Sequence, residues 1–149
     1  MTTVAATTTH ESTPGRRPDA PLPSRIGPYR ILETISRGGG AVVYRARDES
    51  GRDVAVKALA SLQPANQECL RREIYTLARL RHPGVVALLA SGLGDDPPWY
   101  AMELLDRLTL EALWAERATI DAPAVAATIC GVCDTLAFLH GEGIVHRDV

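Results

Sequence analysis

The 149-residue sequence predicts an α+β fold, with a five-stranded antiparallel sheet, one main helix, and then the first helices of a second, helical part. Three observations predict this. Segments rich in the apolar residues typical of strands, one of them with a clear period of two at 29–35, fill much of the stretch between residues 29 and 104. One helical pattern interrupts them at 65–81, and a longer apolar helical pattern follows from residue 122.

The first three strands are predicted in order along the chain. Segment 29–35 carries apolar side chains on one face, and strand character resumes at 42–44 after a run of glycines, which indicates a hairpin. Residues 49–52 are typical of a turn. Residues 53–59 form a third strand, whose continuous apolar run indicates burial on both faces.

The main helix is predicted at 65–81, because Leu70, Ile74 and Leu77 recur at i, i+4 and i+7. The residues at 83–84, a proline and a glycine, stop it. Segments 85–90 and 98–104 then complete the five-stranded sheet.

Two further helices are predicted in the helical part. Thr109 can cap a short helix that runs to about residue 117, since its hydroxyl can accept an early backbone N–H. A long helix from about residue 122 is predicted from an apolar stripe with spacings of four and three, ending at Gly141 and Gly143. The stripe consists of Val125, Ile129, Val132, Leu136 and Leu139.

Composition excludes several classes of protein. A net charge of −2 gives no reason to expect nucleic acid or an anionic membrane as partner. The three cysteines are too few for a disulfide framework and suit a reducing compartment, so we expect a cytoplasmic protein. Residues 1–24 lack an apolar secretory core and are expected to be a disordered leader. No membrane span is expected, because the apolar stretch 122–139 contains Asp134 and many small residues.

Six short motifs follow one another along the chain. They are ISRGGGAVVYRA at 35–46, VAVK at 54–57, a helical glutamate at Glu73, HPGVV at 82–86, WYAMELL at 99–105, and FLHGEGIVHRDV at 138–149. In this order they resemble the glycine-rich hairpin, the strand lysine, its carboxylate partner, the helix-to-strand connection, the hinge, and the opening of the catalytic loop of eukaryotic-like bacterial serine/threonine protein kinases. The resemblance covers about residues 28–149.

This resemblance implies a protein-kinase-like fold and a division of the chain. Residues 25–105 would be the small, ATP-binding lobe and the hinge, after the leader at 1–24. Residues 106–149 would be the start of the large lobe, truncated within the catalytic loop. As a family property, a whole kinase domain needs well over two hundred residues.

The resemblance also implies the roles of three residues. Lys57 would bind the α- and β-phosphates of ATP, Glu73 would pair with Lys57, and Asp148 would position the substrate hydroxyl. Independently of the family, an ammonium on a buried strand needs a carboxylate or phosphate beside it. Sequence leaves open whether Glu73 pairs with it or is an exposed member of a charged helix face. The residues expected around ATP are Ile35, Ser36, Gly38, Gly39, Gly40, Ala41, Val43, Ala55, Lys57, Met102, Glu103 and Leu105.

The glycine-rich hairpin departs from the family pattern G-x-G-x-x-G. Only Gly38 occupies one of its three glycine positions, while Ser36 and Ala41 replace the first and third. Gly39 and Gly40 lie between them and supply flexibility. We therefore expect ATP binding with looser contact to the phosphates.

The leading hypothesis is an ATP-dependent serine/threonine protein kinase that uses Mg²⁺, with an unknown protein substrate. The Asn that follows the catalytic Asp in the family and the D-F-G segment are both missing from these residues, so no metal ligand is expected here and the polypeptide as given should be inactive. The alternative is a non-catalytic, pseudokinase-like binding or scaffold module. A small-molecule phosphotransferase is disfavoured by Arg147, because those relatives usually have Gly between the His and the Asp.

Overall fold

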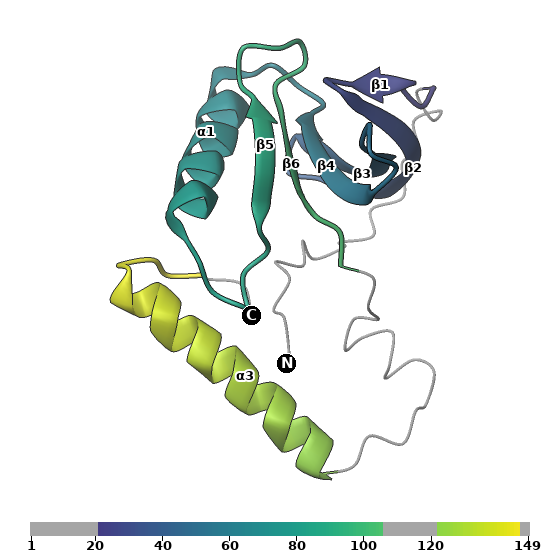
Figure 1. The fold of residues 1–149 in the computed structure, drawn as a ribbon. Coiled ribbons are helices and arrows are strands. Elements are labelled where there is room, and N and C mark those ends of the chain that lie inside the picture. Colours follow the sequence, from purple (N-terminus) through teal and green to yellow (C-terminus); the bar gives the residue numbers. More distant parts are fainter. Residues whose placement is uncertain (1–20, 106–121, 147–149) are drawn as a thin grey trace, which may run out of the picture. The chain divides into compact units, whose positions relative to one another are not determined.

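The computed structural model describes residues 21–105 and 122–146, which belong to two compact units (Figure 1). The first unit contains the sheet and one helix. It comprises the described residues 21–80 and 87–104. The second unit contains a long helix and comprises the described residues 81–86, 105 and 122–146. The short helix predicted at 109–117 lies outside the described residues, as does most of the predicted leader.

The sheet is antiparallel throughout, in the order β1-β2-β3-β4-β6-β5. The strands are β1 (Arg25–Ile26), β2 (Tyr29–Gly38), β3 (Ala41–Arg47), β4 (Asp53–Leu59), β5 (Leu88–Gly92) and β6 (Trp99–Glu103). The five predicted strands are confirmed. The sixth, β1, was not predicted, because a strand of two residues is too short to show a period of two.

Both bounds of one predicted strand were wrong. The strand expected at 85–90 begins at Leu88 and ends at Gly92. Segment 81–86 instead belongs to the second unit. An apolar run of Val and Ala residues cannot by itself distinguish a strand from a connection that packs elsewhere.

Burial along β4 confirms the prediction of a strand covered on both faces. Side chains at even positions of β3 and β4 enter one core cluster, which comprises Ile26, Tyr29, Ile31, Val42, Tyr44, Ala46, Val54, Val56, Ala58, Trp99 and Ala101. The opposite face, built from odd positions, packs on the helix. Its buried cluster comprises Ala41, Leu59, Leu70, Ile74 and Tyr100.

The helix α1 (Pro64–Arg79) forms where its apolar spacing predicts. Pro64 occupies the first turn, where a missing N–H costs no helical hydrogen bond. Leu70 and Ile74 are buried, and Leu77 packs against the same cluster. This face presses α1 against β4 and β5, which fixes the helix relative to the strand that carries Lys57.

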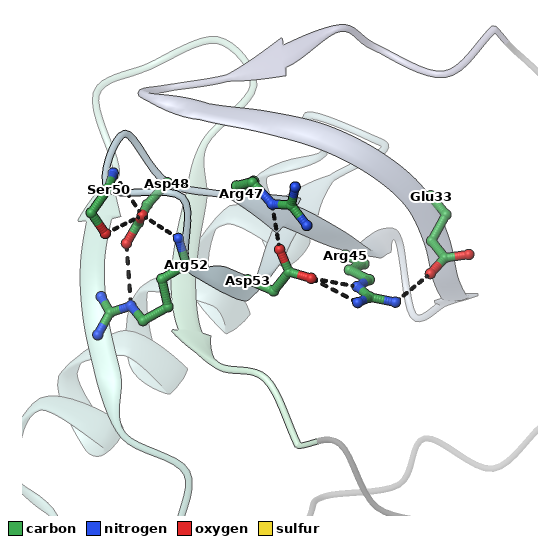
Figure 2. Close-up of polar contacts among 7 residues, drawn as sticks. All are labelled: Glu33, Arg45, Arg47, Asp48, Ser50, Arg52 and Asp53. Carbon is green, nitrogen blue, oxygen red and sulfur yellow. Dashed lines mark hydrogen bonds and ion pairs between the residues drawn. The ribbon is translucent and has the colours of Figure 1, made fainter.

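A turn joins the last residue of β3 to the first residue of β4, and Asp48 holds this turn together. Asp48 accepts hydrogen bonds from the backbone N–H groups of Ser50 and Arg52, both at 2.9 Å, and from the Ser50 hydroxyl at 2.6 Å (Figure 2). The hydroxyl and backbone donors lower the pKa of the Asp48 carboxyl. The turn predicted at 49–52 is therefore present and is closed by its own side chains.

In the second unit, α3 (Ala122–Gly141) confirms the predicted long helix. His82 stacks on Phe138 with ring centroids 4.7 Å apart, and a Cβ added to Gly84 would collide with the side chain of Thr135. Segment 81–86 thus packs tightly on α3. By length and composition α3 is apolar enough to cross a membrane, but this is weak evidence, because core helices meet the same criteria.

Candidate functional site

The centre of the candidate site is an ion pair between Lys57 on β4 and Glu73 on α1. The Lys57 ammonium donates to both carboxylate oxygens of Glu73, at 2.8 Å and 2.7 Å. The two side chains are 24% and 34% exposed. The structure thus brings together the two residues that the motif spacing pairs, and it places Glu73 on the inner side of α1.

A third residue, Tyr100 of β6, completes this cluster. Its hydroxyl donates to Oε1 of Glu73 at 2.9 Å, and Lys57 Nζ lies 5.9 Å from the centre of its ring. Burial raises the pKa of the Tyr100 phenol, and the charge of Glu73 raises it further. We call Lys57, Glu73 and Tyr100 the lysine cluster.

Sequence reasoning missed Tyr100, although two signals pointed to it. Tyr100 lies two positions before Met102 on the same strand, so the two side chains share one face. A tyrosine in a buried strand also needs a partner for its hydroxyl. What could not be known is the register that sets Tyr100 directly opposite Lys57 in the β4–β6 ladder.

The glycine-rich hairpin is a two-residue turn between β2 and β3. Gly38 pairs with Ala41, and Gly39 and Gly40 both have positive φ angles, of 57° and 77°. Residues with side chains rarely adopt this pair of angles, so the turn requires these glycines. A Cβ on Gly40 would also collide with the side chain of Asn66 on α1.

The two departures from the glycine pattern have different structural settings. Ala41 is buried in the core cluster beneath α1, so its methyl group contributes to packing. Ser36 lies on β2 opposite Val43, next to an irregularity in strand register. The methyl group of Ala41 therefore helps to anchor the hairpin to the core beneath α1.

The residues predicted around the adenine base occupy three strands. Val43 lies opposite Lys57, and Ala55 lies two residues before Lys57 on the same face of β4. Ile35 lies on β2 and is 50% exposed. All three lie on the sheet that carries the lysine cluster, and their role towards adenine remains a prediction.

The hinge residues are divided between the two units. Met102 packs against the core cluster beneath α1. The backbone N–H of Glu103 donates to the carbonyl oxygen of Ala87 at 3.0 Å, so a contact of Glu103 with adenine would involve its carbonyl oxygen. Leu105 belongs to the second unit.

The catalytic loop and the metal ligands are not part of this geometry. Asp148 and Arg147 lie outside the described residues. Within 21–105 and 122–146, no group of three His, Cys, Asp or Glu side chains is arranged to hold a metal ion. The described residues therefore contribute no such group of ligands to a metal site.

A second charged cluster lies on the same face as Lys57, towards the other end of β3 and β4. Asp53 accepts from Nε of Arg47 at 2.6 Å and from Nη2 and Nε of Arg45 at 2.7 Å and 3.0 Å (Figure 2). Arg45 also donates to Glu33 at 3.4 Å. The hydrogen bonds from Arg47 and Arg45 lower the pKa of Asp53 to about 2. We call Glu33, Arg45, Arg47 and Asp53 the arginine cluster.

Comparison with known proteins agrees with this geometry. The sequence matches the family described as "Protein kinase domain" over residues 29–149. It is 38% identical over 133 residues to the DNA damage-responsive serine/threonine-protein kinase RqkA of Deinococcus radiodurans, covering 83% of this chain and 19% of the relative. It is 37% identical over 137 residues to a probable serine/threonine-protein kinase of Streptomyces coelicolor, covering 85% of this chain and 20% of the relative.

A third relative is the serine/threonine-protein kinase PknB of Mycobacterium tuberculosis, which is 34% identical over 129 residues, covering 81% of this chain and 21% of the relative. The chain thus spans about a fifth of the length of these curated relatives, with shares of 19%, 20% and 21%.

Proposed function

Because the chain belongs to the protein kinase family, we propose that it carries the ATP-binding half of a serine/threonine protein kinase. The observation that supports this best is the ion pair of Lys57 with Glu73, at 2.7 Å and 2.8 Å. An exposed pair on a helix surface would be of little consequence. This pair instead links a core strand to a helix, on the face of the sheet that also carries Val43 and Ala55.

Each residue of the site would have a distinct task when ATP is bound. Lys57 would place its ammonium beside the α- and β-phosphates, and Glu73 would keep that ammonium from turning away. The hairpin at Gly39 and Gly40 presents a backbone without side chains, which allows close approach to phosphate oxygens. ATP would supply the γ-phosphoryl group, and Asp148 would accept the proton of a Ser or Thr hydroxyl.

These residues supply only part of what transfer requires. Phosphoryl transfer depends mainly on positioning and charge neutralisation. The described residues contain no group of three His, Cys, Asp or Glu side chains arranged around a metal, so we assign no step to Mg²⁺ here. We predict that a polypeptide of these 149 residues transfers no phosphate to itself or to a generic Ser/Thr substrate above the level of Lys57→Met.

The competing proposal is a pseudokinase-like module that binds without catalysis. The observation in its favour is that Ala41 and Ser36 stand at two glycine positions, and that Ala41 is buried in the core. A bulkier, anchored hairpin would hold phosphates less closely. If so, the chain would still use the lysine cluster but would bind ATP weakly.

Nucleotide binding tests the proposal directly. The dissociation constant for ATP would be measured by titration calorimetry, with and without Mg²⁺, for the wild type, Lys57→Met and Arg47→Met. Removing a charged hydrogen-bond donor from the phosphates should weaken binding by roughly tenfold to a hundredfold in Lys57→Met. Arg47→Met removes a cation from the same face and should bind like the wild type. Equal affinity in Lys57→Met and the wild type would refute the site.

A further inference from the structure

We propose that Tyr100 is a positioning residue that holds Glu73 towards Lys57, so that the ion pair is assembled before any nucleotide binds. The importance of that pair rests on the proposed function, in which Lys57 binds phosphate. The contact itself does not depend on it. Tyr100 touches neither substrate nor metal in this proposal, and acts only through Glu73.

The position of Tyr100 brings it to both members of the pair. Register places it directly opposite Lys57 on the neighbouring strand, and its side chain lies on the face that packs against α1. From there the hydroxyl reaches Glu73 at 2.9 Å, while the ring faces the ammonium at 5.9 Å. A cation at this distance from an aromatic ring is attracted to its face.

Burial makes the hydroxyl dependent on Glu73. Tyr100 is only 2% exposed, and Glu73 is the one acceptor recorded for its hydroxyl among the residues that the structure describes. If α1 moved so that Glu73 left, a buried donor would lose its partner, which is unfavourable. This contact therefore favours the position of α1 in which Glu73 meets Lys57.

The hydroxyl and the ring of Tyr100 can be separated experimentally. The ring packs with Leu70 and Ile74 of α1, so the position could simply fill the core. Phenylalanine would preserve that packing and remove only the hydroxyl. A positioning role therefore predicts that Tyr100→Phe acts on α1 and Glu73, whereas a filling role predicts that it is silent.

Hydrogen exchange in the nucleotide-free 149-residue chain is the first test. Exchange would be followed by mass spectrometry in the wild type, Tyr100→Phe, Glu73→Ala and the double variant. Loss of a hydrogen bond to a charged acceptor should accelerate exchange in residues 67–79 by about tenfold in Tyr100→Phe. The double variant should exchange no faster than Glu73→Ala alone. Tyr44→Phe, on the opposite face of the sheet, is the matched control and should leave α1 unchanged.

The ¹³C chemical shift of the phenol carbon is the second test, and it reports on the hydroxyl rather than on the packing of the ring. With ¹³C-labelled tyrosine, the Cζ resonance of Tyr100 at neutral pH should shift in Glu73→Ala relative to the wild type, since the hydroxyl donates to Oε1 of Glu73 at 2.9 Å. An unchanged resonance would show that the phenol does not sense Glu73. The inference would also be overturned if exchange in α1 were unaffected by Tyr100→Phe, if the two substitutions were additive, or if all strands were accelerated equally.

Neither measurement requires nucleotide or turnover. If Lys57→Met bound ATP like the wild type while Tyr100→Phe still accelerated exchange in α1, the proposed function would fall and the positioning role of Tyr100 would stand. If Lys57→Met weakened ATP binding while Tyr100→Phe left α1 unchanged, the positioning role would fall and the proposed function would stand.

Discussion

The lysine cluster and the arginine cluster share the strand β4 and the same face of the sheet, yet they differ in what they connect. Lys57 and Asp53 are four residues apart on β4, roughly 13 Å at the usual rise of a strand. Their shortest ion-pair distances are almost equal, at 2.7 Å and 2.6 Å. Bond length therefore does not distinguish them.

The difference lies in the burial of the cations and in the elements joined. Arg45 and Arg47 are 45% and 41% exposed, and they link strands that are already hydrogen-bonded to each other. Lys57 and Glu73 are 16 positions apart in the sequence, and their ion pair joins a strand to a helix. The buried phenol of Tyr100 lies beside this pair. The second arrangement joins a helix to the sheet and can therefore control the position of that helix, and this is why the proposed function is placed there.

The largest expected contrast is in turnover. In a protein that contains these residues together with the downstream metal ligands, Lys57→Met and Asp148→Asn should each lower the phosphoryl-transfer rate by about 10²-fold or more, because they remove groups that act in the transition state. Asp53→Asn should retain turnover close to the wild type. Steady-state assays on folded variants measure this. Wild-type rates in Lys57→Met, or an equal loss in Asp53→Asn, would remove the distinction between the clusters.

A smaller contrast is expected in stability. Breaking the half-buried pair by Lys57→Ala should lower the free energy of unfolding by about 1–3 kcal/mol, less than the cost for a fully buried pair because part of the charge stays hydrated. Arg47→Ala should cost less, since Asp53 keeps Arg45 and remains in contact with water. Urea unfolding of the two variants provides the comparison. A greater loss in Arg47→Ala would reverse the ranking.

The contribution of the arginine cluster to the free energy of unfolding should depend on pH in the acid range. The pKa of Asp53 is lowered in the folded chain from 3.8 to about 2, so the folded state binds this proton less readily than the unfolded state. Its contribution is therefore present above pH 4 and is lost as the pH falls towards 2. The stability difference between the wild type and Asp53→Asn should shrink across that window. It can be measured by urea unfolding at several pH values.

A matched control for the acid experiment removes the partners instead. The variant with Arg45→Gln and Arg47→Gln should lose the same pH-dependent contribution while keeping the carboxylate. A difference between the wild type and Asp53→Asn that stays constant from pH 5 to pH 2 would contradict the low pKa.

The smallest effect is expected at the exposed pair on the outer side of α1. Arg72 donates to Glu68 at 2.8 Å, and both side chains are more than half exposed. Such i, i+4 pairs contribute about 0.3–0.5 kcal/mol, so Glu68→Gln should barely change the unfolding midpoint. A loss as large as that of Lys57→Ala would show that exposure is a poor guide in this chain.

The sequence was most informative where a motif and a period agreed. The strand around Lys57 and the helix around Glu73 were both predicted from apolar patterns, and the family motif supplied their relationship. Tyr100 was missed because its role depends on strand register, which no local pattern encodes. The start of β5 was misplaced for a similar reason, since the apolar residues before it pack in the second unit.

The contact of Gly84 with Thr135 has a consequence for anyone who divides this chain into pieces. A fragment ended at the hinge, at Leu105, would keep the segment 81–86 but discard α3, the helix on which His82 and Gly84 rest. The sheet unit is thus continuous in space and interrupted in sequence. To produce the sheet unit alone, residue 80 would be joined to residue 87 through a short designed linker. To produce the second unit, segment 81–86 would be kept together with α3.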